Sequence, residues 1–432
     1  MKILVILYLI ILLIPFFVRK DGNLFFRPDR IISMGAMYYS LPLIYNILKG
    51  NDFWNNTEII LFMYILFHAT FLLCYFKTNK KRNTSFFSQY SKVKINRVIK
   101  LSFLFFIFYF IAIYIEHGNI ISYFSMSRLD RFSSHLFSNT GAIASFFKLV
   151  IMSFIILLYI MIFNLKNKYA YKKEIVYFLL LLLSYLFIDV LHENRRFILL
   201  LLIGFGFIAE NKIKIKSFVV LPIAVLCIPF LYGFGTSRGL DAPLSEKIVF
   251  AIENSSSFSS IEVIANVGEN QACIEIFDKI IDYTKVGDFL YFENYLYPLT
   301  FLIPRFIYHD RPLGLPDWYT LTYHPDVYDK GGGFAFSFIG EAYFSFGILG
   351  VIIVAAIFAF IIKKIWIRSN SNIWMSFLMA LIIGRLLILY RLDSVSLFKE
   401  IFFCFFPIYI LSSVFIFNKK NRYTKLCSKK QS

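Results

Sequence analysis

Long apolar runs alternate with short polar segments over most of the 432 residues. A helix needs about 20 mostly apolar residues to cross a bilayer, and about eleven runs approach that length. The runs lie near residues 3–18, 31–48, 59–76, 101–116, 141–163, 175–191, 197–210, 217–234, 346–363, 373–390 and 396–417. The pattern predicts an all-α, polytopic transmembrane protein with about ten to thirteen spans.

Residues 235–345 form one long segment between two predicted spans. A segment of this length is usually functional rather than a simple connection. Apolar residues at helical spacing predict an amphipathic helix over residues 256–281. Residues 290–306 are apolar and aromatic but are broken by Pro298 and Pro304, so we expect them to lie at the membrane interface. The chain then divides into about eight N-terminal spans in 1–234, a loop with the expected active site in 235–345, about three C-terminal spans in 346–417 and a basic tail in 418–432.

Basic residues are concentrated in alternate connections between these runs. Residues 77–100 hold eight Lys or Arg and no Asp or Glu, and the tail from residue 418 holds six more basic residues. Residues 235–345 hold fifteen acidic and seven basic residues. Because Lys and Arg favour the cytoplasmic side of a membrane, the basic segments are predicted to be cytoplasmic and residues 235–345 external.

The composition excludes several classes of protein. Hydrophobic residues make up 58% and charged residues 17% of the chain, whereas soluble domains have about 45–50% and 25%. The net charge of +18 does not indicate nucleic-acid binding, because the basic residues lie between apolar runs rather than on one folded face. The five cysteines have no metal-ligand spacing, so neither a metal nor another cofactor is expected.

Arginine is the common base of the predicted external segments, whereas the cytoplasmic segments use mostly lysine. A guanidinium group can bind two phosphate oxygens at once, so this bias suggests phosphate recognition on the outer side. Anchoring at the membrane interface is the alternative interpretation. The external arginines are Arg128, Arg131, Arg195, Arg196, Arg238, Arg305, Arg311 and Arg391.

The densest group of candidate residues lies between Ile303 and Pro312. It holds Arg305, His309, Asp310 and Arg311, and prolines restrict the backbone on both sides. Such a group could bind an anion and move a proton.

Glu341 lies just before the ninth apolar run, next to Gly340. A carboxylate is costly at this depth unless it has a function or a partner. It could act as a general base on a sugar hydroxyl, or form an ion pair with one of the arginines; the two interpretations are compatible.

Four segments taken in order resemble the bacterial oligosaccharide repeat-unit polymerases, the Wzy-type O-antigen and capsule polymerases. They are Asn194-Arg195-Arg196-Phe197, Ile303-Pro304-Arg305, Asp310-Arg311-Pro312 and the stretch from Gly340-Glu341-Ala342-Tyr343 to Gly350. The resemblance implies a metal-independent membrane glycosyltransferase in the bacterial inner membrane, with its active site facing the periplasm or exterior. Its donor and acceptor would both be undecaprenyl-pyrophosphate-linked oligosaccharides, and a chain-length regulator and a flippase would be further partners.

This resemblance leads to a hypothesis for the site. Glu341, Arg305, His309 and Asp310 are predicted to be catalytic. The predicted substrate-binding residues are Arg195, Arg196, Arg238, Arg311 and Tyr343. Two alternatives stay open, namely a ligase that transfers finished glycan to another acceptor, and a flippase or transporter for lipid-linked oligosaccharides. A transporter should have several charges near mid-bilayer, whereas the charges here gather at the outer edge.

Overall fold

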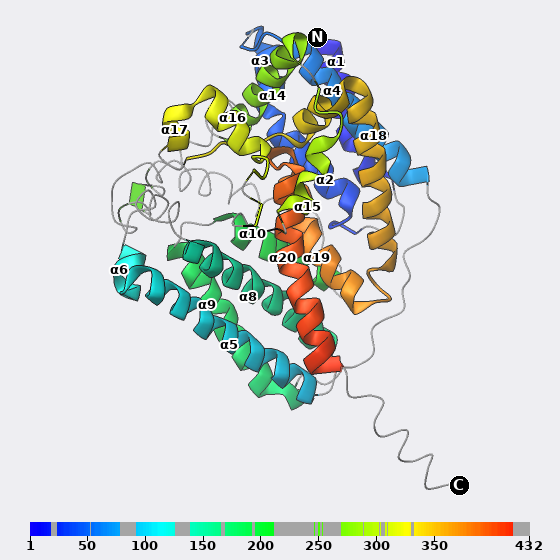
Figure 1. Cartoon of the computed structure of the whole chain (residues 1–432). Helices are drawn as coiled ribbons and strands as arrows, with labels where there is room; N and C mark the ends of the chain where they lie inside the picture. Colours follow the sequence, from blue (N-terminus) through cyan, green and yellow to red (C-terminus); the bar gives the residue numbers. More distant parts are fainter. Residues whose placement is uncertain are drawn as a thin grey trace, which may run out of the picture.

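A computed structural model shows an all-helical molecule in the part of the chain that it describes (Figure 1). Apart from four isolated positions between 246 and 253, that part comprises residues 1–18, 24–51, 53–77, 92–125, 139–165, 169–191, 195–210, 269–287, 289–301, 303, 307–308, 310–329 and 332–417. The prediction of an all-α fold is confirmed for these residues.

The N-terminal half forms α1 (Lys2–Phe17), α2 (Pro28–Tyr39), α3 (Leu41–Lys49), α4 (Thr57–Lys77), α5 (Lys92–His117), α6 (Ile120–Ser125), α8 (Asn139–Phe163), η1 (Tyr169–Tyr171), α9 (Lys172–Leu191) and α10 (Arg195–Glu210). The C-terminal half forms α14 (Glu269–Val286), η4 (Glu293–Tyr295), α15 (Tyr297–Thr300), α16 (Leu315–Tyr323), α17 (Pro325–Asp329), α18 (Phe338–Arg368), α19 (Ile373–Leu387), η5 (Leu389–Arg391), α20 (Ser394–Ser412) and the π-helical turn η6 (Ser413–Phe417).

Five described helices are long and apolar enough to cross a membrane: α4, α5, α8, α18 and α20 with its extension to Phe415. The pair α2 and α3, bent by 48°, would make a sixth if it forms one broken span. The other predicted runs in the described part are helical too, but α1 and α19 are shorter. The predicted number of about eleven spans is therefore not established, and the run at 217–234 lies outside the described residues.

Helix α19 lies at the centre of the packing, where it contacts α2, α8, α10, α18 and α20. Helix α4 packs along α18, and α5 packs along α8. Helices α14, α16 and α17 gather at one end of the bundle, and the C-terminal end of α20 lies at the other end (Figure 1). Cys273, Ile274 and Phe277 of α14 are buried, as the predicted amphipathic pattern requires.

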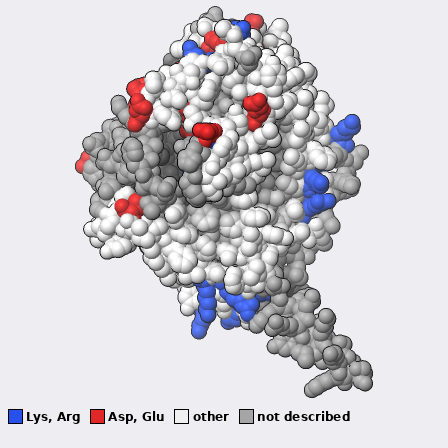
Figure 2. Space-filling view, in the orientation of Figure 1, with Lys and Arg blue, Asp and Glu red and all other residues white. Residues whose placement is uncertain are grey.

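The two ends differ in surface charge. In Figure 2 most visible Asp and Glu side chains lie on the half of the molecule that carries α14, α16 and α17. Lys and Arg side chains gather at the opposite end and along one edge. The folded chain thus keeps the charge separation that the sequence predicts between alternate connections.

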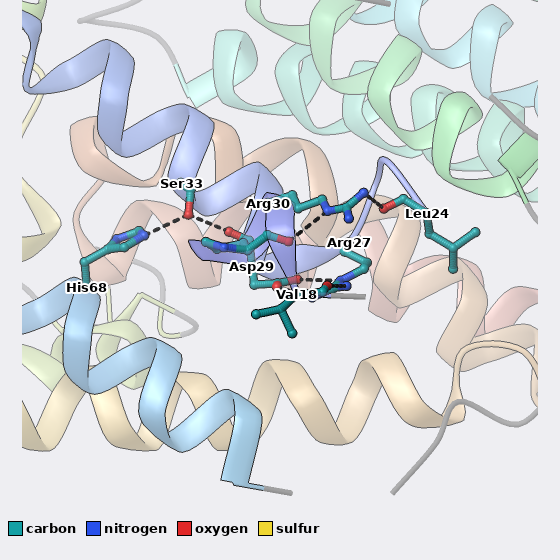
Figure 3. A network of polar contacts seen from close by, with 8 residues as sticks. Val18, Leu24, Arg27, Asp29, Arg30, Ser33 and His68 are labelled. Carbon is teal, nitrogen blue, oxygen red and sulfur yellow. Dashed lines mark hydrogen bonds and ion pairs between the residues drawn. The ribbon is translucent and has the colours of Figure 1, made fainter. Parts of the chain in front are cut away.

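A buried polar network joins α1 to α2 (Figure 3). The Arg27 guanidinium lies 2.5 Å from Asp29 and donates to the carbonyl of Val18 at 2.7 Å. Arg30 donates to the carbonyl of Pro15 at 3.1 Å. Arg27, Asp29 and Arg30 are buried, so these two arginines hold the helices together and are not free surface charges.

The same network continues into α4 and η5. The Ser33 hydroxyl donates to the carbonyl of Asp29 at 2.9 Å and lies 2.9 Å from Nε2 of His68. Nδ1 of His68 lies 2.9 Å from the hydroxyl of Tyr390. Both nitrogens of this buried imidazole therefore have partners, and the ring connects α2 to the turn just after α19.

Candidate functional site

Helix α18 is broken close to its N-terminus. Phe346 and Gly347 have non-helical backbone angles, and φ at Gly347 is +58°. A side chain is disfavoured at that angle, and a Cβ on Gly350 would lie 2.1 Å from the carbonyl oxygen of Ala342. Glycine at these two positions thus permits the break, which separates residues 338–345, including Glu341, from the long apolar part of the helix.

Glu341 is fully buried at this break and accepts three hydrogen bonds. Nδ2 of Asn294 donates to Oε1 at 2.7 Å. Ser394 donates its hydroxyl to Oε1 and its backbone N–H to Oε2, each at 2.6 Å. The carboxylate thus joins the start of α18, η4 and the start of α20. Its described partners are neutral, and within the described residues it forms no ion pair with an arginine; Arg305 and Arg238 lie outside the described residues.

Asp393 caps α20 beside this carboxylate. Its Oδ1 accepts a hydrogen bond from the backbone N–H of Ser396 at 3.3 Å. Burial raises the pKa of Asp393 above its ordinary value, and the nearby negative charge of Asp317 raises it further. Glu341 and Asp393 are close enough to repel each other when both are ionised. Two acidic groups therefore lie together where α18 and α20 begin.

Glu400 joins two arginines from different helices. Its Oε1 pairs with Arg196 of α10, and its Oε2 accepts from Nε of Arg385 of α19 at 3.1 Å. Arg385 is buried and also donates to the carbonyl of Leu381 at 2.6 Å. The side chain of Arg196 is 30% exposed, so one of the two cations reaches the surface of the bundle.

Two phenylalanine rings each have a pair of cations nearby. The Arg196 guanidinium lies 5.0 Å from the centroid of Phe197, and Nζ of Lys148 lies 5.7 Å from it. A second ring, that of Phe301, has the Arg311 guanidinium at 4.0 Å and Nζ of Lys399 at 5.4 Å. Lys399 interacts electrostatically with both Arg311 and Glu400, which relates the two pairs. Lys148, Arg196, Arg311, Arg385 and Lys399 are here named the cation cluster.

Asp189, near the end of α9, forms an ion pair with another helix. It pairs with Lys148 of α8, and both side chains are buried. Residues 192–194, which follow α9, lie outside the described residues. The pair places one more cation next to Phe197, at the edge of the cation cluster.

Five of the nine predicted site residues have described side chains, among them Glu341 at the break of α18. Arg196 and Arg311 lie in the cation cluster. Asp310 is exposed. Tyr343 packs against Phe277 and Phe289, with ring centroids 5.8 and 6.3 Å apart. Outside the description lie Arg238, Arg305, His309 and the side chain of Arg195.

Lys399, Glu400, Arg385 and Lys148 were not predicted to be site residues. A signal was available, because each is a charged residue inside or beside an apolar run. Such residues are costly in a bilayer and are usually paired or functional. Spacing alone could not connect them, because Glu400 lies 204 residues from Arg196.

The arrangement brings these cations together around Glu400 and Phe301, near the buried acids Glu341 and Asp393. A family model described as O-antigen polysaccharide polymerase Wzy matches residues 2–426, nearly the whole chain. The chain belongs to the Wzy family. No curated protein and no solved structure matches it. Membership confirms the resemblance found in the sequence, and this Wzy protein is a membrane protein of O-antigen polymerisation.

Proposed function

We propose that this Wzy protein joins oligosaccharide repeat units carried on undecaprenyl pyrophosphate, at the outer face of the bacterial inner membrane. The donor pyrophosphate would bind the cation cluster. The observation that carries the proposal is the pair of cations on Phe301, Arg311 and Lys399, which come from separate parts of the chain. A guanidinium and an ammonium group side by side suit two adjacent phosphate groups.

The local charge supports this ligand. Arg391 interacts electrostatically with Glu400, and Lys399 interacts with Asp317 and Asp393. The groups that act together are therefore the cations Lys148, Arg196, Arg311, Arg385, Arg391 and Lys399 and the acids Asp189, Asp317, Asp393 and Glu400. Glu341, whose charge acts on that of Asp393, is a fifth acid, so the six cations exceed the acids by one and the group favours an anionic ligand.

The proposed reaction breaks one bond and forms one. A hydroxyl oxygen of the acceptor attacks C1 of the donor sugar that is bonded to the pyrophosphate, and the bond between this C1 and the phosphate oxygen breaks. The electron pair leaves with the polyprenyl pyrophosphate, whose developing charge Arg311, Lys399 and Arg196 would stabilise. The proton of the acceptor hydroxyl passes to a basic group. The candidates are Asp310, which is exposed, and His309, which precedes it in the sequence.

Glu341 receives a different role in this proposal. Its carboxylate is buried and its three hydrogen bonds leave it turned toward protein groups. We therefore assign it as a positioning residue that holds η4 and the start of α20 against α18. Arg305, Arg195 and Arg238 remain proposed pyrophosphate ligands on the strength of their sequence positions.

A deletion strain tests the function by gel separation of its surface glycan and its extracted lipid-linked glycan. Surface glycan that stops at one repeat unit supports the polymerase. Long polymer left on its lipid carrier would instead indicate a ligase, and repeat units trapped on the cytoplasmic face would indicate a flippase. Complementation with Arg311→Ala should fail. Complementation with Arg368→Ala should restore polymer, because Arg368 is an exposed arginine at the C-terminal end of α18.

A further inference from the structure

Residues 289–301 and Ile303 present an apolar surface that the rest of the described bundle leaves uncovered. Leu296 is 62% exposed and Leu299 57% exposed, and Ile303 follows with 40%. Glu293 is the one charged residue in this stretch of sequence. The segment is nevertheless fixed, because α15 contacts α20 and Asn294 bonds to Glu341. An ordered surface of this kind marks an interaction with an apolar partner.

The segment is fastened to α18 at its break. Tyr291 and Phe292 have φ angles of 44° and 67°, which non-glycine residues rarely adopt. Such angles persist where the surroundings fix them. Phe292 stacks on Phe346 with ring centroids 5.8 Å apart, and Tyr291 meets the same ring edge-on at 5.7 Å. Exposed Phe346 and its exposed neighbour Leu349 therefore continue the apolar surface onto the apolar part of α18.

The cation cluster lies at the other end of the segment. Phe301, which carries Arg311 and Lys399 on its ring, comes two residues after Leu299. Two cations thus lie beside the apolar surface, on the ring of Phe301, which stands between Leu299 and Ile303 in the sequence. An amphipathic lipid with an anionic head requires this combination, because its head and tail are covalently joined.

We propose that the isoprenoid chain of the lipid-linked donor lies on the surface formed by Leu296, Leu299, Phe346 and Leu349, with its pyrophosphate at Arg311 and Lys399. The inference rests on the proposed function and adds to it where the lipid tail binds. The break in α18 would let the tail enter from the membrane, since it exposes Phe346 beside the segment. Bulk phospholipid, whose phosphate also meets basic residues at the membrane interface, is the competing occupant, and the comparison of carriers below separates the two.

The test uses the full-length protein in lipid vesicles and two donors that differ only in their carrier, undecaprenyl or the shorter farnesyl. Phe346→Ser with Leu349→Ser, at the end of the surface away from the cations, should raise the apparent KM for the undecaprenyl donor about tenfold, because only the longer chain reaches these residues. The KM for the farnesyl donor and the kcat for both donors should stay within about twofold. The matched control is Leu179→Ser with Leu183→Ser, two exposed leucines of α9, which should change neither KM.

Each other outcome has a defined meaning. An equal loss with both donors would show general damage, and unchanged KM values would show a surface for bulk lipid; either result overturns the inference. Polymerisation in these experiments would still support the proposed function. Failure of the wild-type protein to polymerise either donor would overturn both.

Discussion

Two groups of arginines in this molecule have opposite environments. Arg27 and Arg30 are buried between α1 and α2, where Asp29 and backbone carbonyls receive their hydrogen bonds. Arg196 and Arg311 lie at the edge of the bundle over phenylalanine rings, and neither is fully buried. The same residue type therefore supports the fold in one region and forms the candidate binding site in the other. The difference is set by what the guanidinium group contacts, not by its neighbours in sequence.

Asp29→Ala should give the largest effect, because it leaves Arg27 buried without its carboxylate. Removing one partner of a buried ion pair costs about 3–5 kcal/mol. We expect little folded protein in the membrane and a clearly lower Tm in detergent. Asp326→Ala, which removes an exposed aspartate of α17, should leave the Tm unchanged. Equal stability of the two variants would contradict a structural role for the Arg27 network.

Arg311→Ala should have the opposite signature, a loss of activity with normal folding. Removal of one group that stabilises developing charge typically lowers kcat about 100-fold or more. We expect single repeat units in a vesicle assay, with the amount of folded protein and the Tm close to those of Arg368→Ala. Arg311→Lys should retain part of the activity, because it keeps the charge but loses the two-pronged geometry. A polymer of normal length in Arg311→Ala would remove this residue from the site.

Glu341→Gln separates a positioning role from a catalytic one. The amide keeps the size of the side chain but loses one acceptor for Ser394, at a cost of about 1–3 kcal/mol. We expect a lower Tm and polymerisation within about tenfold of the wild type. A base in the reaction would instead lose about 100-fold or more in kcat with little change in stability.

Ser345→Ala should have the smallest effect of the four. Its hydroxyl donates to Oδ1 of Asn294 at 3.0 Å or to the carbonyl of Glu341 at 2.8 Å. Loss of one such neutral hydrogen bond costs about 1 kcal/mol. A small fall in Tm with near-normal polymer is expected, and severe loss of polymer would show that this hydroxyl does more than support Asn294.

Much of the fold was accessible from the sequence, but the site was accessible only in part. The apolar runs predicted where α4, α5, α8, α18 and α20 lie, because apolar length alone decides whether a helix can span a bilayer. Arg196 and Arg311 were predicted as substrate ligands, and both belong to the cation cluster. Glu341 was predicted as a catalytic group at the outer edge, yet its carboxylate is buried, because η4 and α20 close over it.

By itself, the sequence determined the helical membrane class, the asymmetry of charge between the ends and the Wzy family, since these depend on composition and local order along the chain. Only the tertiary structure decided which charges meet. Glu400 pairs with Arg385 and with Arg196, which lies 204 residues earlier in the chain. Arg311 and Lys399 contact the same ring, that of Phe301. The physical reason is that a charge in an apolar bundle must find a partner, and helix packing, rather than sequence spacing, determines which partner is within reach.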